Sequence, residues 1–442
     1  MSVISGIPFF KNAASSVKIS SEMSVWLDTK FPSETREKFH IPVDKHGNTS
    51  TYMNGNSLGC QPKKAQEYSE KVFKDWAKTG LGMHFDGAFL PAVKCDLYTQ
   101  DGFGKLVGAK NPEVEVVAMN GLSVNLHLFL SSFYRPAGNK TKILLEKGAF
   151  PSDHYAVRSQ VKLSGNDEDL HTILLEPKNG KRYLETVDII NSIRENAEDL
   201  ALILLPGIQY FTGQFFQIKE ITAVANELNI PIGWDLAHAV GNVPMELHDW
   251  GVDFAVWCSY KYVNSGAGGI GGAFLHEKHS NNFDRPRMYG WWGHKLETRF
   301  LMDNNLDSEA GVLSYRLCNP PPLLVAPLYA SLEIFEGTSM EEIRARSLLL
   351  TSYLEHLVDN LFDKSVVEIV TPRDVEQRGA QLSLKINFGD KSIQEVEDEL
   401  VEQGILCDTR HDIVRIAPAP LYNTFQDVWT VTSAISKIVN PK

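Results

Sequence analysis

The stretch that decides the fold is DFAVWCSYKYVN (residues 253–264), followed by GAGGIGG (residues 266–272). Its first half, Asp253–Cys258, is short, continuously apolar and rich in strand-forming residues, which is typical of a strand buried on both faces of a parallel sheet. Lys261 follows the carboxyl end of that strand, the edge at which α/β sheets bind ligands. A desolvated lysine there becomes a nucleophilic amine that can hold a carbonyl cofactor as a Schiff base. The alternative is a surface lysine just past a strand.

A second apolar run, NIPIGWDLAH (residues 229–238), brings Asp235 and His238 to the same kind of strand end. Pyridoxal phosphate needs an anion beside its pyridine nitrogen, because the protonated ring accepts the electrons released when a substrate bond breaks. Asp235 is placed to be that anion. An aspartate after a strand is also a common helix cap or turn residue. The combination of Asp-x-x-His with a strand-borne lysine downstream is less common than either motif alone, and it favours the cofactor site.

The composition indicates a globular enzyme. The chain has 442 residues, 43% of them hydrophobic, which is enough for a large core and more than one lobe. Its formal net charge of -12 and its lack of a basic cluster argue against a nucleic-acid partner. Five scattered cysteines without metal-ligand spacing predict buried thiols in a reducing compartment, and no metal site. Met1–Ser16 does not resemble an export signal and no run reaches transmembrane length, so we expect a cytoplasmic protein with no membrane partner.

Strand-like and helix-like runs alternate through the middle of the chain. We expect strands at residues 142–145, 200–205, 230–234 and 254–257, and helices at residues 184–199 and 217–229. This alternation predicts a mostly parallel sheet with helices on both faces.

The sequence texture changes near the C-terminus, where we expect one long helix at 328–361, a strand at 381–386 and a helix at 392–404. The prediction is an α/β fold in three parts. They are an N-terminal arm that joins the small domain (1–60), a large cofactor-binding domain (61–326) and a small α+β domain (327–442).

The segment Gly266–Gly271 satisfies G-x-G-x-x-G, the dinucleotide-binding fingerprint. That fingerprint requires a helix immediately after the glycines. The residues that follow, Gly272–His276, instead have the pattern of a strand. We therefore interpret the glycines as a close backbone approach beside the cofactor lysine, and we do not expect a nicotinamide cofactor.

A phosphate site is predicted at NGLSVNLH (residues 120–127), where a strand ends and an apolar helix begins. The first turn of a helix offers free backbone N–H groups and the positive end of the helix dipole. The backbone of Leu122 and the hydroxyl of Ser123 suit a phosphate group. Ser123 could equally be a helix N-cap, and one residue can do both.

The two strand ends also carry a family resemblance. WDLAHAVGN (234–242), HDWGVDFA (248–255) and CSYKY (258–262) resemble kynureninase nearly without interruption. Further blocks resemble the same family, in its order along the chain: GNSLG (55–59), EKGAFPSD (146–153), YFTGQ (210–214), GWWGH (290–294), SYR with NP (314–320) and RIAPAPLYN (415–423). Such a series is highly specific.

The resemblance implies a pyridoxal 5'-phosphate enzyme with the aspartate aminotransferase-like fold (fold type I). Its implied catalytic residues are Lys261 as the Schiff-base lysine, Asp235 at the ring nitrogen, and Tyr260 at the phosphate and the reacting centre. The cofactor-binding residues that it implies are Leu122, Ser123, Phe150, Pro151, Ser152, Asp153, Asp235, His238, Tyr260, Lys261, Trp291 and Asn319. Phe150 would stack on the ring, although core packing is an alternative for it. Trp291 and Asn319 would reach the cofactor from the partner subunit, so the site would be complete only in a homodimer.

For the substrate, the resemblance implies that Arg415 binds the α-carboxylate, since guanidinium and carboxylate groups match in a bidentate pair. An arginine in an apolar strand is also often paired with an acid. The flat aromatic end would suit Trp292, His294 and His84, which could equally be interface core. Two positions depart from the family. Pro206 stands where many kynureninases have serine on the phosphate side, and Cys318 stands where animal enzymes have serine near the aromatic end.

The activity that the resemblance implies is hydrolysis of L-kynurenine or 3-hydroxy-L-kynurenine to L-alanine and the matching anthranilate, in tryptophan degradation and NAD biosynthesis. Two alternatives belong to other classes. One is another enzyme of the same fold, such as a cysteine desulfurase or an aminotransferase, but no cysteine lies in an obvious mobile loop. The other is a catalytically silent dimeric scaffold, against which the intact Lys261, Asp235, Tyr260 and Arg415 argue.

Overall fold

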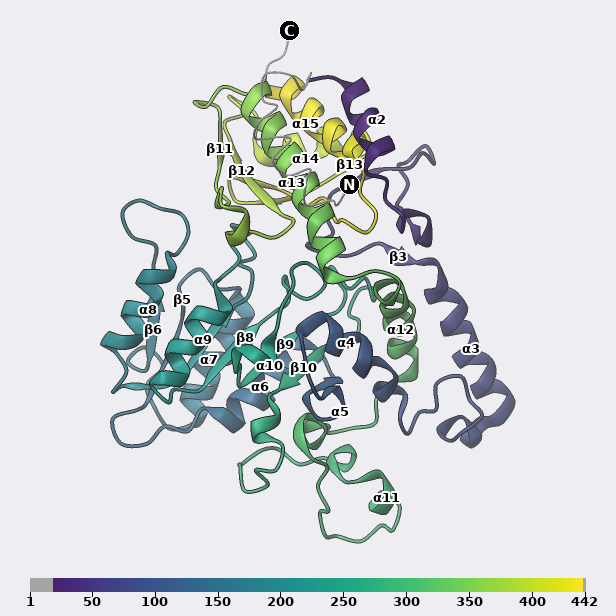
Figure 1. Cartoon of the computed structure of the whole chain (residues 1–442), viewed down its shortest axis with the longest axis vertical. Coiled ribbons are helices and arrows are strands. Elements are labelled where there is room, and N and C mark those ends of the chain that lie inside the picture. The colour runs from purple at the N-terminus through teal and green to yellow at the C-terminus, as the bar shows by residue number, and fades with distance from the viewer. Residues whose placement is uncertain (1–18, 440–442) are drawn as a thin grey trace.

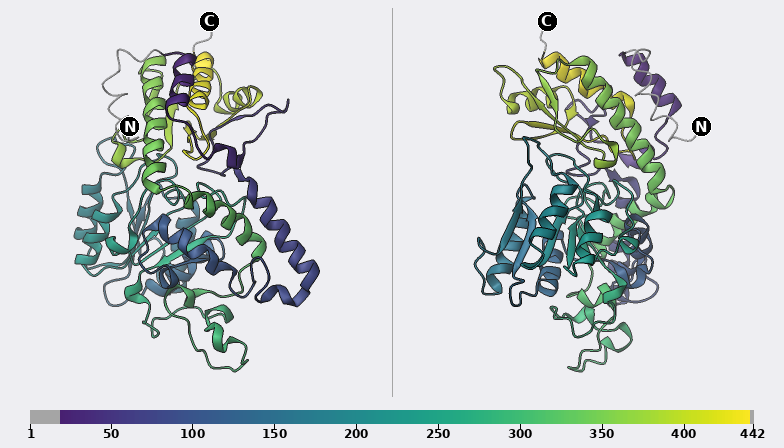
Figure 2. Two further views of the ribbon diagram at one scale, coloured as in Figure 1. Left: turned by 45° about the vertical axis from the view of Figure 1, so that its right-hand side comes forward. Right: turned by 60° about the vertical axis from the view of Figure 1, so that its left-hand side comes forward.

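The computed structural model describes residues 19–439, so the segment inspected for an export signal lies outside the described residues. Figures 1 and 2 show two lobes, one above the other. The lower lobe is built around a seven-stranded sheet covered by helices, and the upper lobe packs a smaller sheet against helices. Within residues 19–439, no helix combines the length and apolarity needed to cross a membrane.

The large sheet carries the strands expected in the middle of the chain. Its order is β4 (Val116–Ala118), β10 (Gly272–Leu275), β9 (Phe254–Trp257), β8 (Ile232–Asp235), β7 (Leu200–Pro206), β5 (Lys142–Glu146) and β6 (Thr172–Leu175). The five strands from β9 to β6 are parallel, and β10 is antiparallel to both of its neighbours. Every residue of β7, β8 and β9 is buried, as continuous apolar runs predict for central strands. The predicted mostly parallel sheet is confirmed.

Helices follow most of these strands and cover the sheet. They are α6 (Leu122–Phe133), α7 (Pro151–Leu163), α8 (Thr186–Glu195), α9 (Ile218–Glu227) and the short α10 (Leu247–Trp250), with α3 (Lys63–Thr79), α4 (Gln100–Val107), α5 (Pro112–Glu115) and α12 (Pro322–Glu336) elsewhere in the lobe. The two predicted helices at 184–199 and 217–229 correspond to α8 and α9, which are shorter at both ends. The strand expected directly after the glycine-rich segment is β10, so the dinucleotide fingerprint lacks its helix.

The upper lobe has a four-stranded antiparallel sheet in the order β11 (Val367–Ile369), β12 (Leu382–Ile386), β15 (Ile413–Ile416) and β14 (Asp408–Arg410). It packs against α13 (Met340–Leu361), α14 (Ile393–Glu402) and α15 (Phe425–Val439). Its apolar core includes Leu27 of α2 (Ser21–Lys30) and Met53, which follows β2 (Thr51–Tyr52). The strand β2 pairs in parallel with β13 (Ile405–Leu406), and α2 lies beside α15. The chain's N-terminal part thus packs with its C-terminal part.

The single long helix expected at 328–361 is wrong, because the structure has two helices there. The first, α12, ends at Glu336 with Gly337 as its C-cap, and α13 begins after Ser339. Ser339 forms a capping box with Glu342, in which each residue's side chain bonds the other's backbone N–H, at 3.2 Å in both cases. This Ser-x-x-Glu signal starts a new helix shortly after Gly337, the C-cap of α12. The break lets α12 join the core of the large lobe while most of α13 packs in the upper lobe.

Candidate active site

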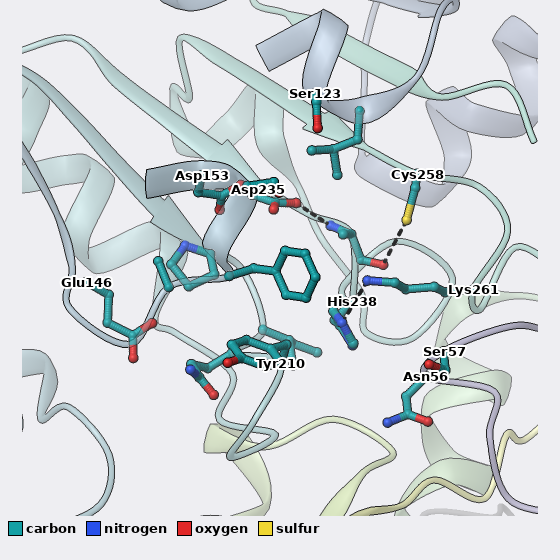
Figure 3. A pocket seen from close by; sticks show the side chains of 18 of the residues that line it. Asn56, Ser57, Ser123, Glu146, Asp153, Tyr210, Asp235, His238, Cys258 and Lys261 are labelled. Carbon is teal, nitrogen blue, oxygen red and sulfur yellow. Dashed lines mark hydrogen bonds between the residues drawn. The ribbon is translucent and has the colours of Figure 1, made fainter. Parts of the chain in front are cut away.

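A cavity of about 300 Å³ lies at the carboxyl edge of the large sheet. Four parallel strands end at its wall: β5 at Glu146, β7 at Pro206, β8 at Asp235, and β9 just before Cys258. The upper lobe contributes Arg410 and Arg415, and the N-terminal part contributes Asn56 and Ser57. The strands' shared direction explains why residues distant in sequence meet at one edge. Figure 3 shows the cavity with its side chains converging from several elements.

Lys261 projects into this cavity beside His238. Its Nζ lies 2.8 Å from Nε2 of His238 and 6.0 Å from the ring centroid of Phe150. Burial and, to a lesser extent, the charge of Lys261 hold the pKa of His238 well below its usual value. The imidazole is therefore neutral and accepts a hydrogen bond from the ammonium group through Nε2. This contact fixes the direction of the lysine amine.

The loop that carries Lys261 is held by the chain's N-terminal part. The backbone N–H of Gly59 donates to the carbonyl oxygen of Tyr260 at 2.8 Å. A Cβ at Gly59 would collide with the carbonyl oxygen of Lys261 and the side chain of Asn264, so only glycine allows this approach. Burial, with a smaller effect of Cys258, raises the pKa of Tyr260, which therefore stays a neutral phenol with a proton to donate.

Two buried carboxyl groups, Asp153 and Asp235, lie next to each other on one wall (Figure 3). Asp235 accepts a hydrogen bond from the backbone N–H of Ala237 at 2.8 Å. Burial is the main cause that raises the pKa of both groups, and the neighbouring charge of Asp235 raises that of Asp153 further. Oδ1 of Asp153 is buried and has no hydrogen-bond partner among the described residues. Such a pair can accept a hydrogen bond from a positively charged ring nitrogen or a ring N–H group.

The N-terminus of α6 is also part of the cavity wall. Gly121 is the N-cap and provides no side-chain hydrogen bond, and Leu122 and Ser123 of the first turn line the cavity. Ser123 is therefore inside the helix and is not its N-cap. A helix N-terminus with free N–H groups facing a cavity suits a phosphate group.

Arg415 is buried in the cavity wall and is paired with an acid, as the alternative interpretation from sequence expected. It donates from Nη1 to the carbonyl oxygen of Tyr210 at 2.7 Å, and it forms an ion pair with Asp408. Burial lowers its pKa to about 10, so it keeps its positive charge at neutral pH. Its Nε is buried and has no partner among the described residues. It is thus held in place with a donor still available.

Most of the cofactor residues expected from sequence line this one cavity: Leu122, Ser123, Phe150, Ser152, Asp153, Asp235, His238, Tyr260 and Lys261, with Arg415 for the substrate. Pro151 begins α7 and is not part of the cavity wall. The prolyl ring suits the first position of the helix, because that position has no helical partner for an N–H.

The remaining expected residues lie away from the cavity of their own chain. Trp291 is half exposed and packs edge-on against the buried Trp292. His294 contacts Thr298 through Nε2 at 2.9 Å, and His84 lies near Phe85. Asn319 lines a separate cavity together with Cys318. Cys318 is exposed, so the expectation of five buried thiols is wrong at this position, because the residue lies in the irregular segment before α12.

Several cavity residues were not assigned a role from sequence: Asn56, Ser57, Glu146, Gln209, Tyr210 and Arg410. All except Arg410 lie in or next to blocks with a family resemblance, which was the available signal. Glu146 is notable because burial raises its pKa to about 8 and its Oε2 has no partner among the described residues. Gln209 links two cavity loops, since its Nε2 donates to the carbonyl oxygen of Gly148 and its Oε1 accepts from two backbone N–H groups.

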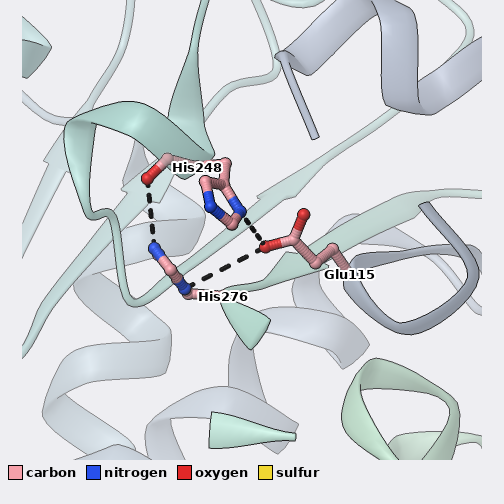
Figure 4. Close-up of side chains that lie close together, drawn as sticks. All are labelled: Glu115, His248 and His276. Carbon is pink, nitrogen blue, oxygen red and sulfur yellow. Dashed lines mark hydrogen bonds and ion pairs between the residues drawn. The ribbon is translucent and has the colours of Figure 1, made fainter. Parts of the chain in front are cut away.

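A second titratable cluster, Glu115, His248 and His276, lies outside the cavity, near the ends of α5 and β10 (Figure 4). The buried carboxylate of Glu115 accepts from Nδ1 of His248 at 2.8 Å and from three backbone N–H groups. Nδ1 of His276 also accepts from a backbone N–H, at 3.1 Å. Because these lone pairs accept hydrogen bonds, hydrogen bonding explains the cluster without a metal ion. The cluster links the end of α5 and the segment after β10 with α10.

Comparison with known proteins gives one consistent family. The family model described as "Kynureninase C-terminal domain" matches residues 343–435. Kynureninase from Myxococcus xanthus is 46% identical and covers 89% of this chain and 91% of its own. Kynureninase from Homo sapiens is 44% identical and covers 92% of this chain and 90% of its own.

Solved structures show the fold. A cysteine desulfurase from Thermococcus onnurineus NA1 superposes with a TM-score of 0.74 at 17% identity, over 93% of this chain and 99% of that chain. A cysteine desulfurase from Escherichia coli gives a TM-score of 0.73 at 15% identity, over 92% of this chain and 98% of that chain. These likenesses confirm the aspartate aminotransferase-like fold, and at such identities they carry the fold alone.

Proposed function

The chain belongs to the kynureninase family, and on that premise we propose how its own residues carry out the family's reaction. It is a pyridoxal-phosphate-dependent hydrolase that cleaves a carbon–carbon bond of L-kynurenine or 3-hydroxy-L-kynurenine, with L-alanine and the corresponding anthranilate as products. The observation that carries the assignment to this cavity is its arrangement: one lysine, a buried acid pair, a helix N-terminus and a buried arginine all face the same space.

The cavity fits pyridoxal phosphate on the evidence of its unpartnered groups. The acid pair of Asp153 and Asp235 would hold the protonated ring nitrogen, and the first turn of α6 would hold the phosphate. Phe150 offers a ring face, and Lys261 offers the amine. When bound, the cofactor supplies an electron sink for bonds broken at the substrate's α and β carbons.

The residues then divide the remaining tasks. Arg415 binds the substrate α-carboxylate and orients the α-carbon toward Lys261. The amine of Lys261, steered by neutral His238, takes the proton from the α-carbon. Asp235 would stay ionised beside the pyridine nitrogen of the cofactor and would keep that nitrogen protonated. Tyr260, a neutral phenol, is the proton donor and acceptor for the later steps, in which water adds to the γ-carbonyl carbon, the bond between the β- and γ-carbons breaks, the acyl part leaves as the aromatic acid, and the β-carbon receives a proton.

We propose a homodimer in which Trp291 and Asn319 complete the partner's site. Large exposed apolar side chains support this, because Phe85, Trp291 and Phe300 form a continuous aromatic surface through ring contacts of 5.8 and 6.2 Å. Monomers rarely expose such patches without a partner. On this proposal Trp292, His294 and His84 lie near the aromatic end of the partner's substrate.

Three smaller proposals follow from the same fold. The division into an arm, a large domain and a small domain is kept, but we place the boundary between the large and small domains at residues 337–339, because α12 packs in the core of the large lobe.

We propose a cytoplasmic location, which the five free thiols support. Both kynurenine and its 3-hydroxy form remain proposed substrates, with Cys318 near the aromatic end.

The experiment that tests the function is turnover by purified protein loaded with pyridoxal phosphate. L-kynurenine should disappear with equal amounts of anthranilate and L-alanine formed, and Lys261→Ala should abolish turnover. L-cysteine is the matched alternative substrate, given the fold shared with desulfurases. Sulfide release from L-cysteine at a higher kcat/KM than kynurenine cleavage would contradict the proposal.

A further inference from the structure

The hairpin of β14 and β15 carries three charged side chains on one face of the small sheet. Asp408 and Arg415 are direct cross-strand partners. Arg410 lies two residues after Asp408, and because side chains alternate along a strand, it belongs to the same face. Arg410 and Arg415 both line the active-site cavity. The register of the hairpin therefore brings two cations and one anion to a single wall.

Asp408 is shared between the two arginines. One carboxylate oxygen accepts from Nη2 of Arg415, and the other accepts from Nη1 of Arg410. The side chains are 45% exposed for Arg410, 10% for Asp408 and 2% for Arg415, so the shared carboxylate is desolvated and Arg410 is on its solvent side. Ser57 adds a weak contact to Asp408 at 3.4 Å.

This arrangement sets the net charge of the cavity wall where the substrate carboxylate would bind. Arg415 and Asp408 alone would form a neutral pair, and the Asp408 carboxylate would repel a second carboxylate at Arg415. With Arg410 present, two guanidinium groups share one carboxylate, and one net positive charge remains. His238 adds none, because burial lowers its pKa well below the usual value. The net charge of this wall thus depends on Arg410.

Building on the proposed function, we propose that Arg410 is a positioning residue for substrate binding, which holds Asp408 while Arg415 pairs with the α-carboxylate of the substrate. The ligand class is an α-amino acid with a free carboxylate. A neutral amide of the same shape does not need the net positive charge. Arg410 therefore sets the preference for the acid over its amide, and it makes no contact with the reacting atoms.

The test uses cofactor-loaded Arg410→Gln protein, titrated with L-alanine and with L-alaninamide while the cofactor absorbance is followed. We expect the Kd of L-alanine to rise about tenfold, which equals about 1.4 kcal/mol, and the Kd of L-alaninamide to stay within about twofold. The KM for kynurenine should also rise about tenfold, with kcat within about threefold.

Two further variants keep the result interpretable. Lys385→Gln removes a cation from the neighbouring strand β12, outside the cavity wall, and should leave both Kd values unchanged. The double variant Arg410→Gln/Asp408→Asn restores one net positive charge at Arg415, so its Kd for L-alanine should return to within about threefold of wild type. If the single variant is too unstable to measure, the Kd of the double variant for L-alanine still tests the proposal.

Equal weakening of L-alanine and L-alaninamide in Arg410→Gln, or no recovery in the double variant, would overturn the proposal. A loss confined to kcat would do the same, because it would place Arg410 in the chemistry. Failure of the proposed function is a separate outcome, since it would appear as absent kynurenine cleavage by the wild-type protein.

Discussion

The buried carboxyl pair explains why a single aspartate can control the electron sink. Asp235 and Asp153 lie together in a desolvated wall, where burial raises the pKa of each carboxyl group. A carboxylate is stable there only beside a cation, and the protonated pyridine nitrogen is such a partner. Asp235 accepts a backbone hydrogen bond, which makes it the member of the pair that holds the charge.

We predict that Asp235→Ala loses at least about a hundredfold in turnover and in exchange of the substrate α-proton with deuterated solvent. The physical reason is the loss of the anion that keeps the ring protonated. Proton exchange is measured by NMR on L-alanine, and near-UV circular dichroism checks that the fold is retained. Exchange near the wild-type rate in a folded Asp235→Ala protein would show that another group stabilises the ring.

Glu146 gives a prediction for the pH dependence of stability. Its pKa is raised to about 8 by burial, well above the value of about 4.3 for an exposed glutamate. Between these values the folded protein binds more protons than the unfolded chain, so the free energy of unfolding falls as pH rises. In Glu146→Gln this fall should shrink by on the order of 2 kcal/mol across pH 5 to 8.

The measurement is urea unfolding of cofactor-free wild type and Glu146→Gln at several pH values. Glu176→Gln is the control, because it removes an exposed carboxylate that is paired with Lys147. An identical pH profile in wild type and Glu146→Gln would mean that the carboxyl group is solvated in solution.

At the scale of elements, the first turn of α6 is the part of the site that depends on backbone. Its N-cap is Gly121, so no side chain competes for the free N–H groups that face the cavity. We predict that Ser123→Ala weakens pyridoxal phosphate binding about tenfold, because one donor to the phosphate is lost. Affinity for pyridoxal, which lacks the phosphate, should not change.

Equilibrium dialysis with both compounds measures this difference. Ser131→Ala is the control in the same helix, since the Ser131 hydroxyl donates to the carbonyl oxygen of Leu128 within the helix. If Ser123→Ala weakens pyridoxal and pyridoxal phosphate equally, the helix terminus does not hold the phosphate.

The elements also show what sequence could predict. The central strands were predictable because each is a continuous apolar run ended by polar or glycine residues, as in β9. A single long helix is the wrong prediction because both α12 and α13 carry helix-like patterns, and the break between them is marked by Gly337 and the capping box at Ser339. The residues on one wall of the site, Asp235 and Lys261, were predictable because they follow neighbouring parallel strands. Arg410 was not predictable, because it lies outside the blocks with a family resemblance, on the sheet of the upper lobe.

At the scale of the whole molecule, the cavity draws on three distant parts of the chain. The N-terminal part supplies Asn56 and Ser57, the large lobe supplies the cofactor residues, and the upper lobe supplies Arg410 and Arg415. Only the packing of both chain ends in the upper lobe brings them together. No local pattern shows that these parts meet, so the GNSLG block (55–59) marks Asn56 and Ser57 as family-like residues without showing that they face the site.

The proposed dimer leads to a complementation prediction. If Asn319 serves the partner's site, mixing inactive Lys261→Ala chains with inactive Asn319→Ala chains gives heterodimers with one site that carries both lesions and one intact site. Random exchange makes about half of the dimers heterodimers, so activity should recover to roughly a quarter of wild type. Light scattering and mass spectrometry verify the dimer and the exchange. No recovery in verified heterodimers would assign Asn319 to its own subunit's site.

The most direct test of the central claim is to locate the covalent attachment of the cofactor. Protein loaded with pyridoxal phosphate is reduced with borohydride, digested, and mapped by peptide mass spectrometry. We predict that the reduced cofactor is found on Lys261, at one per chain, and that Lys261→Ala protein carries none. Reduced cofactor on any other lysine, with Lys261 unmodified, would contradict the assignment of this cavity as the active site.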